Sequence, residues 1–323
     1  MRRRGFMALI GGALASPIAA RAQQPSVPVI GFLSPLEAYP PSLNEFHNGL
    51  AESGYHEGRN VLIEYRWGEG HYDRLPTLAA DLVRRRVNVI VAGGGSISGL
   101  AAKAATSTIP IVALSGGDPV TLGLVASLSR PSGNVTGVAQ LVTAAELKRL
   151  ELLHELVPTS NAIAYLVNPG IPTWPIQDME SEARRLGVKL AVLTASSDRD
   201  LAAAFATINQ EGVGALVVGS DPFFFMRRNQ LVALSKRHRV PTMYYFRDFV
   251  AAGGLISYGT RLAEGWHQIG VYTAKILKGT KPADLPFVQQ SEKIELVINL
   301  KAAKVLGLDV PLSLLTRADE LIE

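Results

Sequence analysis

Short apolar runs alternate with amphipathic stretches from Val27 onward. Runs rich in Val, Ile and Leu predict strands at 27–34, 61–67, 87–93 and 109–114. Helices are predicted between them, at 42–53, 75–86 and 96–106. In the second of these helices, apolar residues recur from Leu75 to Val83 at the spacing of one helical face. Continuously apolar strands separated by helices predict a parallel sheet covered on both faces.

The same pattern restarts after a turn-rich patch at 130–134. Strands are predicted at 162–167, 188–194, 213–219 and 242–245, with helices at 144–157, 176–186, 198–210 and 226–239. A strand at 255–257 and a helix at 264–277 then indicate a return towards the first half. We therefore predict an α/β protein with two Rossmann-like lobes. Lobe one comprises 23–140 and about 259–282, lobe two comprises 141–258, and 283–323 is assigned to neither lobe.

The first 22 residues have the pattern of a secretory signal peptide. Three arginines precede an apolar stretch that is short for a membrane span, and Ala20-Arg21-Ala22 supplies the small residues of a cleavage site. Cleavage is expected after Ala22. The segment 3–7 also fits a twin-arginine signal, so the Sec and twin-arginine routes both stay open. We expect a soluble, monomeric mature protein in the periplasm.

Composition narrows the function classes. The 323 residues are 47% hydrophobic and 19% charged, which excludes a disordered chain and favours two domains. No cysteine is present, which excludes disulfides, Cys-ligated metals, a Cys nucleophile and a lipid-anchoring cysteine. The net charge of +4 comes from four arginines in the leader, whose removal leaves 28 basic and 28 acidic residues. With no basic stripe either, no nucleic-acid partner is expected.

Polar and glycine residues follow the predicted strands, where an open α/β sheet binds its ligand. The candidates in lobe one are Ser34, Gly95, Ser96, Ser115, Gly116 and Asp118. Ser96 begins a predicted helix, so its hydroxyl and the helix N-terminus would suit a carboxylate, or Ser96 is an ordinary N-cap. Asp118 precedes Pro119 and is also consistent with a helix cap.

The candidates in lobe two are Asn168, Asp221, Tyr245 and Tyr258. Asp221 directly follows an apolar strand, so it either binds an ammonium group or caps the helix that begins at Pro222. Aromatic residues cluster near these strand ends, some of them in the core, and such a cluster suits an aromatic ligand.

Sequence signatures of catalysis are missing. No G-x-S-x-G elbow, H-E-x-x-H pair or Walker sequence occurs, and the six histidines have no metal-ligand spacing. The glycines at 93, 95 and 99 do not fit a dinucleotide fingerprint. We therefore predict no catalytic residue, no metal and no cofactor.

A series of short motifs resembles the ABC transporter substrate-binding proteins of the tryptophan/tyrosine-uptake type along essentially the whole chain. The motifs lie at 29–33, 60–67, 109–112, 117–120, 133–137, 150–153, 220–224, 253–259 and 276–279. The resemblance implies a type I periplasmic-binding-protein fold with a three-segment hinge and a ligand held between the lobes. It implies capture of a small carboxylate-bearing solute, such as an aromatic amino acid, and its delivery to an ABC permease in the inner membrane.

The resemblance also implies a division of roles. Ser96 and the loop 115–118 would hold a carboxylate, and Asn168 and Asp221 would hold an ammonium group. A sensor subunit that feeds a membrane kinase, or a secreted α/β enzyme, is the alternative function.

Overall fold

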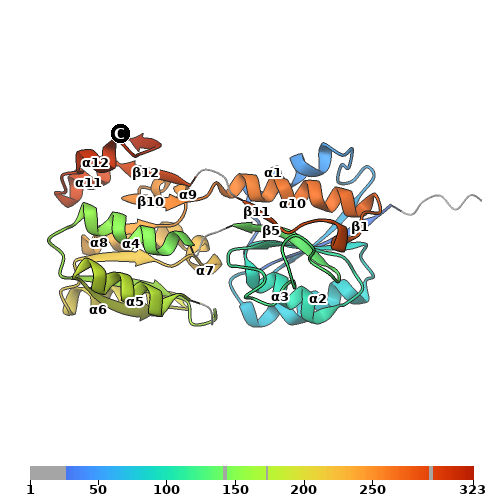
Figure 1. The fold of residues 1–323 in the computed structure, drawn as a ribbon, viewed down its shortest axis with the longest axis horizontal. Helices are drawn as coiled ribbons and strands as arrows, with labels where there is room; N and C mark the ends of the chain where they lie inside the picture. The colour runs from blue at the N-terminus through green and yellow to red at the C-terminus, as the bar shows by residue number, and fades with distance from the viewer. Residues whose placement is uncertain (1–26, 141–143, 172–173, 291–293) are drawn as a thin grey trace, which may run out of the picture.

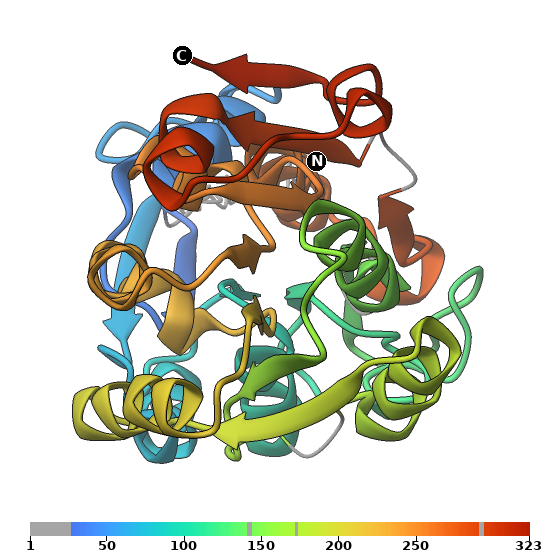
Figure 2. The same ribbon diagram turned by 90° about the vertical axis from the view of Figure 1, so that its left-hand side faces the viewer.

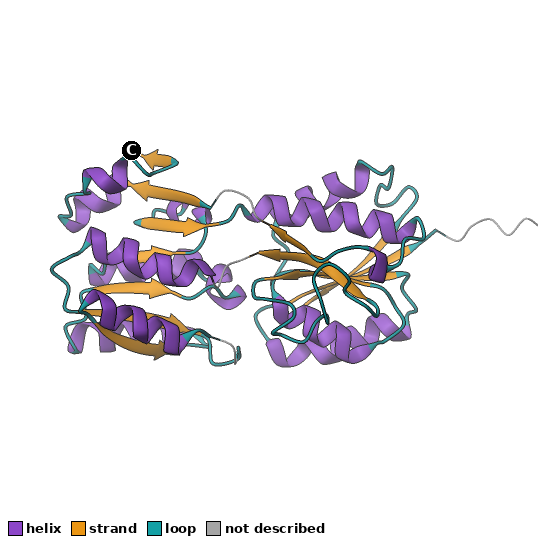
Figure 3. Cartoon of the chain, viewed as in Figure 1, coloured by secondary structure: helices purple, strands orange, loops and turns teal. Residues whose placement is uncertain are grey.

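The computed structural model describes residues 27–140, 144–171, 174–290 and 294–323. The predicted signal peptide lies outside the described residues. The described chain forms two lobes side by side, each with a β-sheet between layers of helices (Figures 1 and 3). None of the helices in these ranges is both long enough and apolar enough to cross a membrane.

Lobe one is built on a sheet whose neighbouring strands are all parallel. The strand order is β11 (Val288–Gln290), β5 (Val135–Gln140), β4 (Ile111–Ser115), β3 (Val89–Ala92), β1 (Val29–Ser34) and β2 (Leu62–Trp67). One face packs against α1 (Pro40–Ala51) and α10 (Leu262–Leu277), and the other against α2 (Leu75–Arg84) and α3 (Ser96–Ala105) (Figure 1). The 3₁₀ helices η1 (Tyr72–Arg74) and η2 (Pro282–Asp284) complete the lobe.

Lobe two has a second sheet with helices on both faces (Figure 2). Its strand order is β13 (Glu320–Ile322), β12 (Glu295–Asn299), β10 (Ile256–Gly259), β9 (Thr242–Tyr244), β8 (Ala215–Val218), β6 (Ala162–Val167) and β7 (Lys189–Thr194). One face carries α6 (Asp198–Gln210), α7 (Pro222–Met226), α8 (Arg228–His238) and α9 (Arg247–Ala251). The other carries α4 (Ala144–Leu156), α5 (Ile176–Leu186), α11 (Leu300–Leu306) and α12 (Leu312–Leu315). All strand pairs are parallel except β10 with β12.

The chain passes between the lobes three times, after β5, after β10 and after β11. The residues 283–323, which the sequence leaves unassigned, therefore divide between the two lobes. β11 pairs with β5 in lobe one, whereas β12 and β13 extend the sheet of lobe two. The predicted fold class, α/β with two predominantly parallel sheets, is confirmed.

Several element predictions are confirmed, and four strands, β5, β11, β12 and β13, were missed. The helices predicted at 176–186 and 198–210 have the same bounds in the structure. The helix predicted at 226–239 is confirmed as α8 within two residues of its bounds, and the short helix α7 precedes it. β5 was missed because Gly137 interrupts its apolar pattern. A Cβ atom at Gly137 would lie 1.9 Å from the carbonyl oxygen of Ala113 in β4, so only glycine fits there.

Helices α1 and α10 cross at a pair of glycines. A Cβ at Gly49 would lie 2.1 Å from the carbonyl oxygen of His267, and a Cβ at Gly270 would lie 2.3 Å from that of Phe46. The two backbones therefore touch, which holds α10, the helix that follows the second inter-lobe crossing, firmly on lobe one.

We predict that Gly270→Ala lowers the free energy of unfolding by about 1–3 kcal/mol, because the added methyl group forces the two helices apart. Urea denaturation of the two proteins measures this difference. Ala263→Ser, at an exposed position of the same helix, is the control and should change stability by less than about 0.5 kcal/mol. Equal stability of Gly270→Ala and the wild type would show that the helices are not in backbone contact.

Candidate functional site

Residues that follow strands of both lobes line two adjoining chambers between the lobes. The first, which we call the Trp266 chamber, is lined by Leu36, Gly94, Gly95, Leu114, Gly116, Gln140, Ser220, Asp221, Pro222, Phe225, Tyr245, Phe246, Leu262 and Trp266. The second, the Trp174 chamber, is lined by Gly95, Ser96, Ile97, Leu100, Gly116, Gly117, Thr121, Leu122, Glu146, Gly170, Ile171, Trp174, Pro175, Ser220 and Pro222. Gly95, Gly116, Ser220 and Pro222 border both chambers.

The lobes lie close together in this arrangement. The volume of the Trp266 chamber is about 70 Å³, and that of the Trp174 chamber is about 250 Å³. Small-molecule sites are typically about 300–1,000 Å³. A ligand the size of an amino acid therefore has to extend through both chambers or push the lobes slightly apart.

Asp221 is the acidic residue of the Trp266 chamber, and it is only 1% exposed. It is the N-cap of α7, so its Oδ1 atom accepts the backbone N–H of Phe223 at 2.8 Å. The same oxygen accepts the Asn168 amide at 3.0 Å and the Tyr72 hydroxyl at 2.8 Å. The sequence left open whether Asp221 caps a helix or binds an ammonium group, and the structure is compatible with both. Oδ1 caps α7, whereas Oδ2 is buried without a hydrogen-bond partner.

The protonation of Asp221 reflects this environment. Burial raises its pKa to about 6, and the hydrogen bonds from Asn168, Tyr72 and Phe223 act in the opposite direction. The carboxylate is therefore ionised at neutral pH and becomes protonated in mildly acidic solution.

Two tyrosines of lobe one reach across to lobe two. Tyr72 in η1 donates its hydroxyl hydrogen to Asp221 and accepts the backbone N–H of Phe223 at 2.9 Å. Tyr39, the residue before α1, donates to the Oδ1 atom of Asp248 in α9 at 2.5 Å, and the Arg228 guanidinium lies 5.0 Å from the centre of its ring. These contacts hold the lobes closed from two positions.

A buried ion pair on α4 lies beside the Trp266 chamber, and its Glu146 lines the Trp174 chamber. Arg149 and Glu146 are 0% and 1% exposed, and Nη1 of Arg149 lies 3.1 Å from Oε1 of Glu146. Arg149 also donates to the Tyr258 carbonyl oxygen and to the Ser220 hydroxyl, and Glu146 accepts the Ser220 backbone N–H. The pair fixes the loop that leads into Asp221 and the end of β10.

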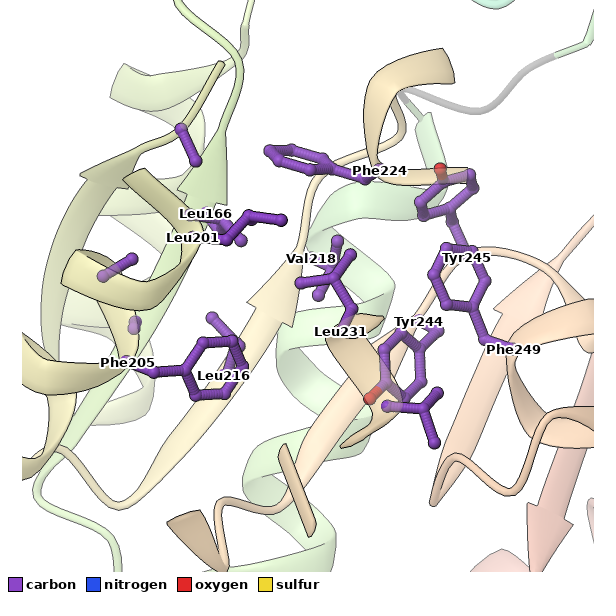
Figure 4. Close-up of a cluster of buried hydrophobic side chains, with 14 of the residues drawn as sticks. Leu166, Leu201, Phe205, Leu216, Val218, Phe224, Leu231, Tyr244, Tyr245 and Phe249 are labelled. Atoms are coloured by element: carbon purple, nitrogen blue, oxygen red, sulfur yellow. The ribbon is translucent and has the colours of Figure 1, made fainter. Parts of the chain in front are cut away.

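The aromatic candidates separate into site and core. Tyr245 lines the Trp266 chamber and donates its hydroxyl hydrogen to the carbonyl oxygen of Asp221 at 2.6 Å. Tyr244 points into the core of lobe two beside Phe249, where its hydroxyl donates to Ser235 (Figure 4). Tyr258 lines neither chamber, and its main contact with the site is its carbonyl oxygen on Arg149.

The polar candidates of lobe one are largely bonded to one another. The Ser96 hydroxyl lies 2.9 Å from that of Ser115 and accepts the backbone N–H groups of Gly116 and Gly117. Gly95 is the N-cap of α3, so Ser96 is neither an ordinary cap nor a free hydroxyl. In this arrangement the Ser96 oxygen occupies two of the N–H groups that a carboxylate would use.

The two remaining candidates of lobe one lie outside the chambers. The Ser34 hydroxyl accepts the backbone N–H of Leu36. Asp118 is exposed, and its carboxylate accepts the N–H groups of Val120 and Thr121. The predicted helix after Asp118 is wrong, because residues 119–123 form a turn, which Asp118 caps.

Sequence reasoning missed several residues of this region, among them Tyr72, Gln140, Glu146, Arg149 and Trp266. Glu146 and Arg149 did leave a signal, because opposite charges three residues apart share the helix face that carries the buried Leu150 and Leu153. The others gave none. Within the described ranges, no group of three His, Cys, Asp or Glu side chains is placed to hold a metal ion.

The comparisons with known proteins agree with this geometry. The sequence model of the family described as "ABC transporter substrate binding protein" matches residues 29–322. This chain is an ABC transporter substrate-binding protein. Its two-lobed architecture is the type I periplasmic-binding-protein fold.

Three relatives of this substrate-binding protein are informative. It is 24% identical to a tyrosine-binding protein from Clostridioides difficile over 274 residues, which are 83% of this chain and 78% of that protein. A structure from Streptococcus pneumonia in complex with L-Trp has a TM-score of 0.80 and 26% identity, covering 92% of this chain and 100% of that one. A conserved domain protein from Vibrio cholerae has a TM-score of 0.80 and 27% identity, covering 91% and 99%.

We predict that Asp221→Asn makes this substrate-binding protein more stable than the wild type at neutral pH, by about 1–3 kcal/mol. The folded pKa of about 6 lies above the ordinary value of 3.8, so the folded protein binds more protons between these pH values. Wild-type stability should therefore decline, relative to the variant, as the pH rises from 4 to 6. Urea denaturation of both proteins at pH 4.5 and 7.5 tests this, and a constant difference would contradict it.

Proposed function

We propose that this protein is the exported receptor of an ABC importer and that it closes around an amino acid, with aromatic amino acids as the first candidates. The observation that carries the proposal is the buried, unpartnered Oδ2 atom of Asp221 in a chamber between the lobes. A positively charged ligand group would supply the missing partner of that oxygen. Phe225, Tyr245 and Phe246 in the same chamber suit an apolar or aromatic side chain.

The cellular setting belongs to the same proposal. A leader cleaved after Ala22 would deliver the protein to the periplasm by the Sec or the twin-arginine route, free of a lipid anchor because no cysteine is present. There the closed, monomeric receptor would pass its ligand to a permease in the inner membrane. The relatives that bind tyrosine and L-Trp support an amino acid as the ligand class.

Calorimetry of the mature protein with L-tyrosine and L-tryptophan tests the ligand class, and native mass spectrometry of the purified protein would identify a ligand that co-purifies. Saturable binding of either amino acid is expected. If neither amino acid binds and the co-purified molecule lacks an amine, the proposed ligand class is wrong.

Asp221→Asn should weaken binding of the amino acid by about 2–5 kcal/mol, because the ligand ammonium group loses its counter-charge. Asp118→Asn is the matched control and should leave the affinity unchanged, since Asp118 lies outside both chambers. Wild-type affinity should also fall as the pH drops through about 6, where Asp221 becomes protonated. Calorimetry from pH 5 to 8 measures both effects. Equal losses of affinity in the two variants would show that Asp221 does not bind the ligand.

Tyr72→Phe should favour the open form, because two hydrogen bonds between the lobes are lost. We expect a larger radius of gyration of the ligand-free protein by small-angle X-ray scattering. Affinity for the amino acid should fall about 5- to 30-fold, in line with roughly 1 kcal/mol for each of the two lost hydrogen bonds. Tyr55→Phe, on lobe one and outside both chambers, should behave as the wild type. Identical scattering and affinity for Tyr72→Phe would contradict its role in closure.

A further inference from the structure

Three of the residues that line the Trp266 chamber each carry a buried side-chain polar atom without a hydrogen-bond partner. The atoms are Oδ2 of Asp221, Nε2 of Gln140 and Nε1 of Trp266. Buried polar groups are almost always paired, because an unpaired one forfeits its hydration without compensation. One acceptor and two donors in a single chamber therefore describe the complementary groups of a missing molecule.

The three atoms come from opposite lobes. Gln140 is the last residue of β5 and Trp266 lies in the second turn of α10, both in lobe one. Asp221 precedes α7 in lobe two. A ligand that satisfies all three atoms would bridge the lobes, with a donor towards lobe two and an acceptor towards lobe one.

Packing fixes the orientation of Trp266. Its ring stacks on Phe32, with centroids 5.7 Å apart and an interplanar angle of 11°. It also lies against Gly93, where a Cβ atom would come within 2.4 Å of Cη2. The indole N–H is therefore held in one direction and needs no reorganisation to bind an acceptor.

Among the described residues, those that line the Trp266 chamber carry negative charge but no positive charge. The described residues that line it include Asp221 but no Lys, Arg or His. Arg149 lies behind Ser220 and Tyr245, where it is paired with Glu146. The donor end of a ligand would thus meet a full negative charge, whereas its acceptor end would meet only neutral N–H groups.

We propose that Gln140 and Trp266 bind the acceptor end of the ligand whose amine is held by Asp221. This assignment rests on the proposed function and places the acceptor group away from Ser96 and Ser115, whose hydroxyls bond to each other. It defines a ligand class: the amine is essential, a carboxamide can replace the carboxylate, and an acid without an amine is excluded. Neutral donors bind a carboxylate or an amide oxygen, but they do not compensate a lone negative charge beside Asp221.

The ligand side of the test uses four indole compounds titrated into the mature wild-type protein at pH 7 by calorimetry. L-tryptophanamide should bind within about fivefold of L-tryptophan. Tryptamine, which lacks the acceptor, should bind about 10- to 100-fold more weakly. Indole-3-propionate, which lacks the amine, should bind at least about 100-fold more weakly. The matching tyrosine series is measured in parallel.

The protein side uses Trp266→Phe and Gln140→Met, which remove the N–H groups and keep most of the side-chain volume. Each should weaken L-tryptophan about tenfold or more and leave tryptamine unchanged, since tryptamine has no group for these donors. A general loss of structure would weaken both ligands alike. Ser96→Ala tests the alternative position of the acceptor group in the Trp174 chamber. Asp118→Asn, outside both chambers, is the control and should bind both ligands as the wild type does. Thermal unfolding confirms that each variant is folded.

The outcomes separate the two proposals. If L-tryptophan binds the wild type and both variants equally, or if only Ser96→Ala weakens it, the assignment of Gln140 and Trp266 is wrong while the proposed function stands. Equal binding of indole-3-propionate and L-tryptophan would also overturn the assignment. If the wild type binds neither amino acid, the proposed ligand class fails and this inference fails with it.

Discussion

The buried carboxylate of Asp221 is the constraint on which the inter-lobe site depends. One oxygen is shared by the N-terminus of α7, by Asn168 of the same lobe and by Tyr72 of the other lobe. The second oxygen has no partner. A buried charge is tolerated only when it is well hydrogen-bonded, so lobe closure and ligand binding both act on the stability of this one group. That coupling is a physical reason for a two-lobed receptor to close on a ligand with a positive group.

The buried ion pair of Arg149 and Glu146 holds the residues around Asp221 in place. Arg149 and Glu146 hold the Ser220 loop and the end of β10, near two of the three points where the chain crosses between lobes. Neither residue lines the Trp266 chamber. Their role is to orient the loop that presents Asp221, and fully buried charges that are paired and hydrogen-bonded do this rigidly.

Periodicity predicted much of the fold because most strands here are apolar on both faces and most helices have one apolar face. The helix at 176–186 and the strand at 162–167 are confirmed residue for residue. β5 was missed because Gly137 breaks its pattern, and the reason for that glycine is the Ala113 carbonyl of a neighbouring strand. β11 and β13 have only three residues each, and the lobe to which β11, β12 and β13 belong depends on long-range pairing.

Local sequence determined which residues follow the strands, and hence that Asp221, Asn168, Gly95 and Gly116 would gather between the lobes. It also determined local hydrogen bonds such as those of Asp118, because its partners are its own neighbours in the chain. Only the tertiary structure decided that Ser96 bonds to Ser115, that Tyr72 crosses to Asp221, and that Gln140 and Trp266 keep unpaired donors in the same chamber. Those relations join residues from 19 to 149 positions apart. The physical reason is that hydrogen-bond partners so distant in sequence leave no periodic or local pattern, and they are set only when the two sheets and their helices have packed.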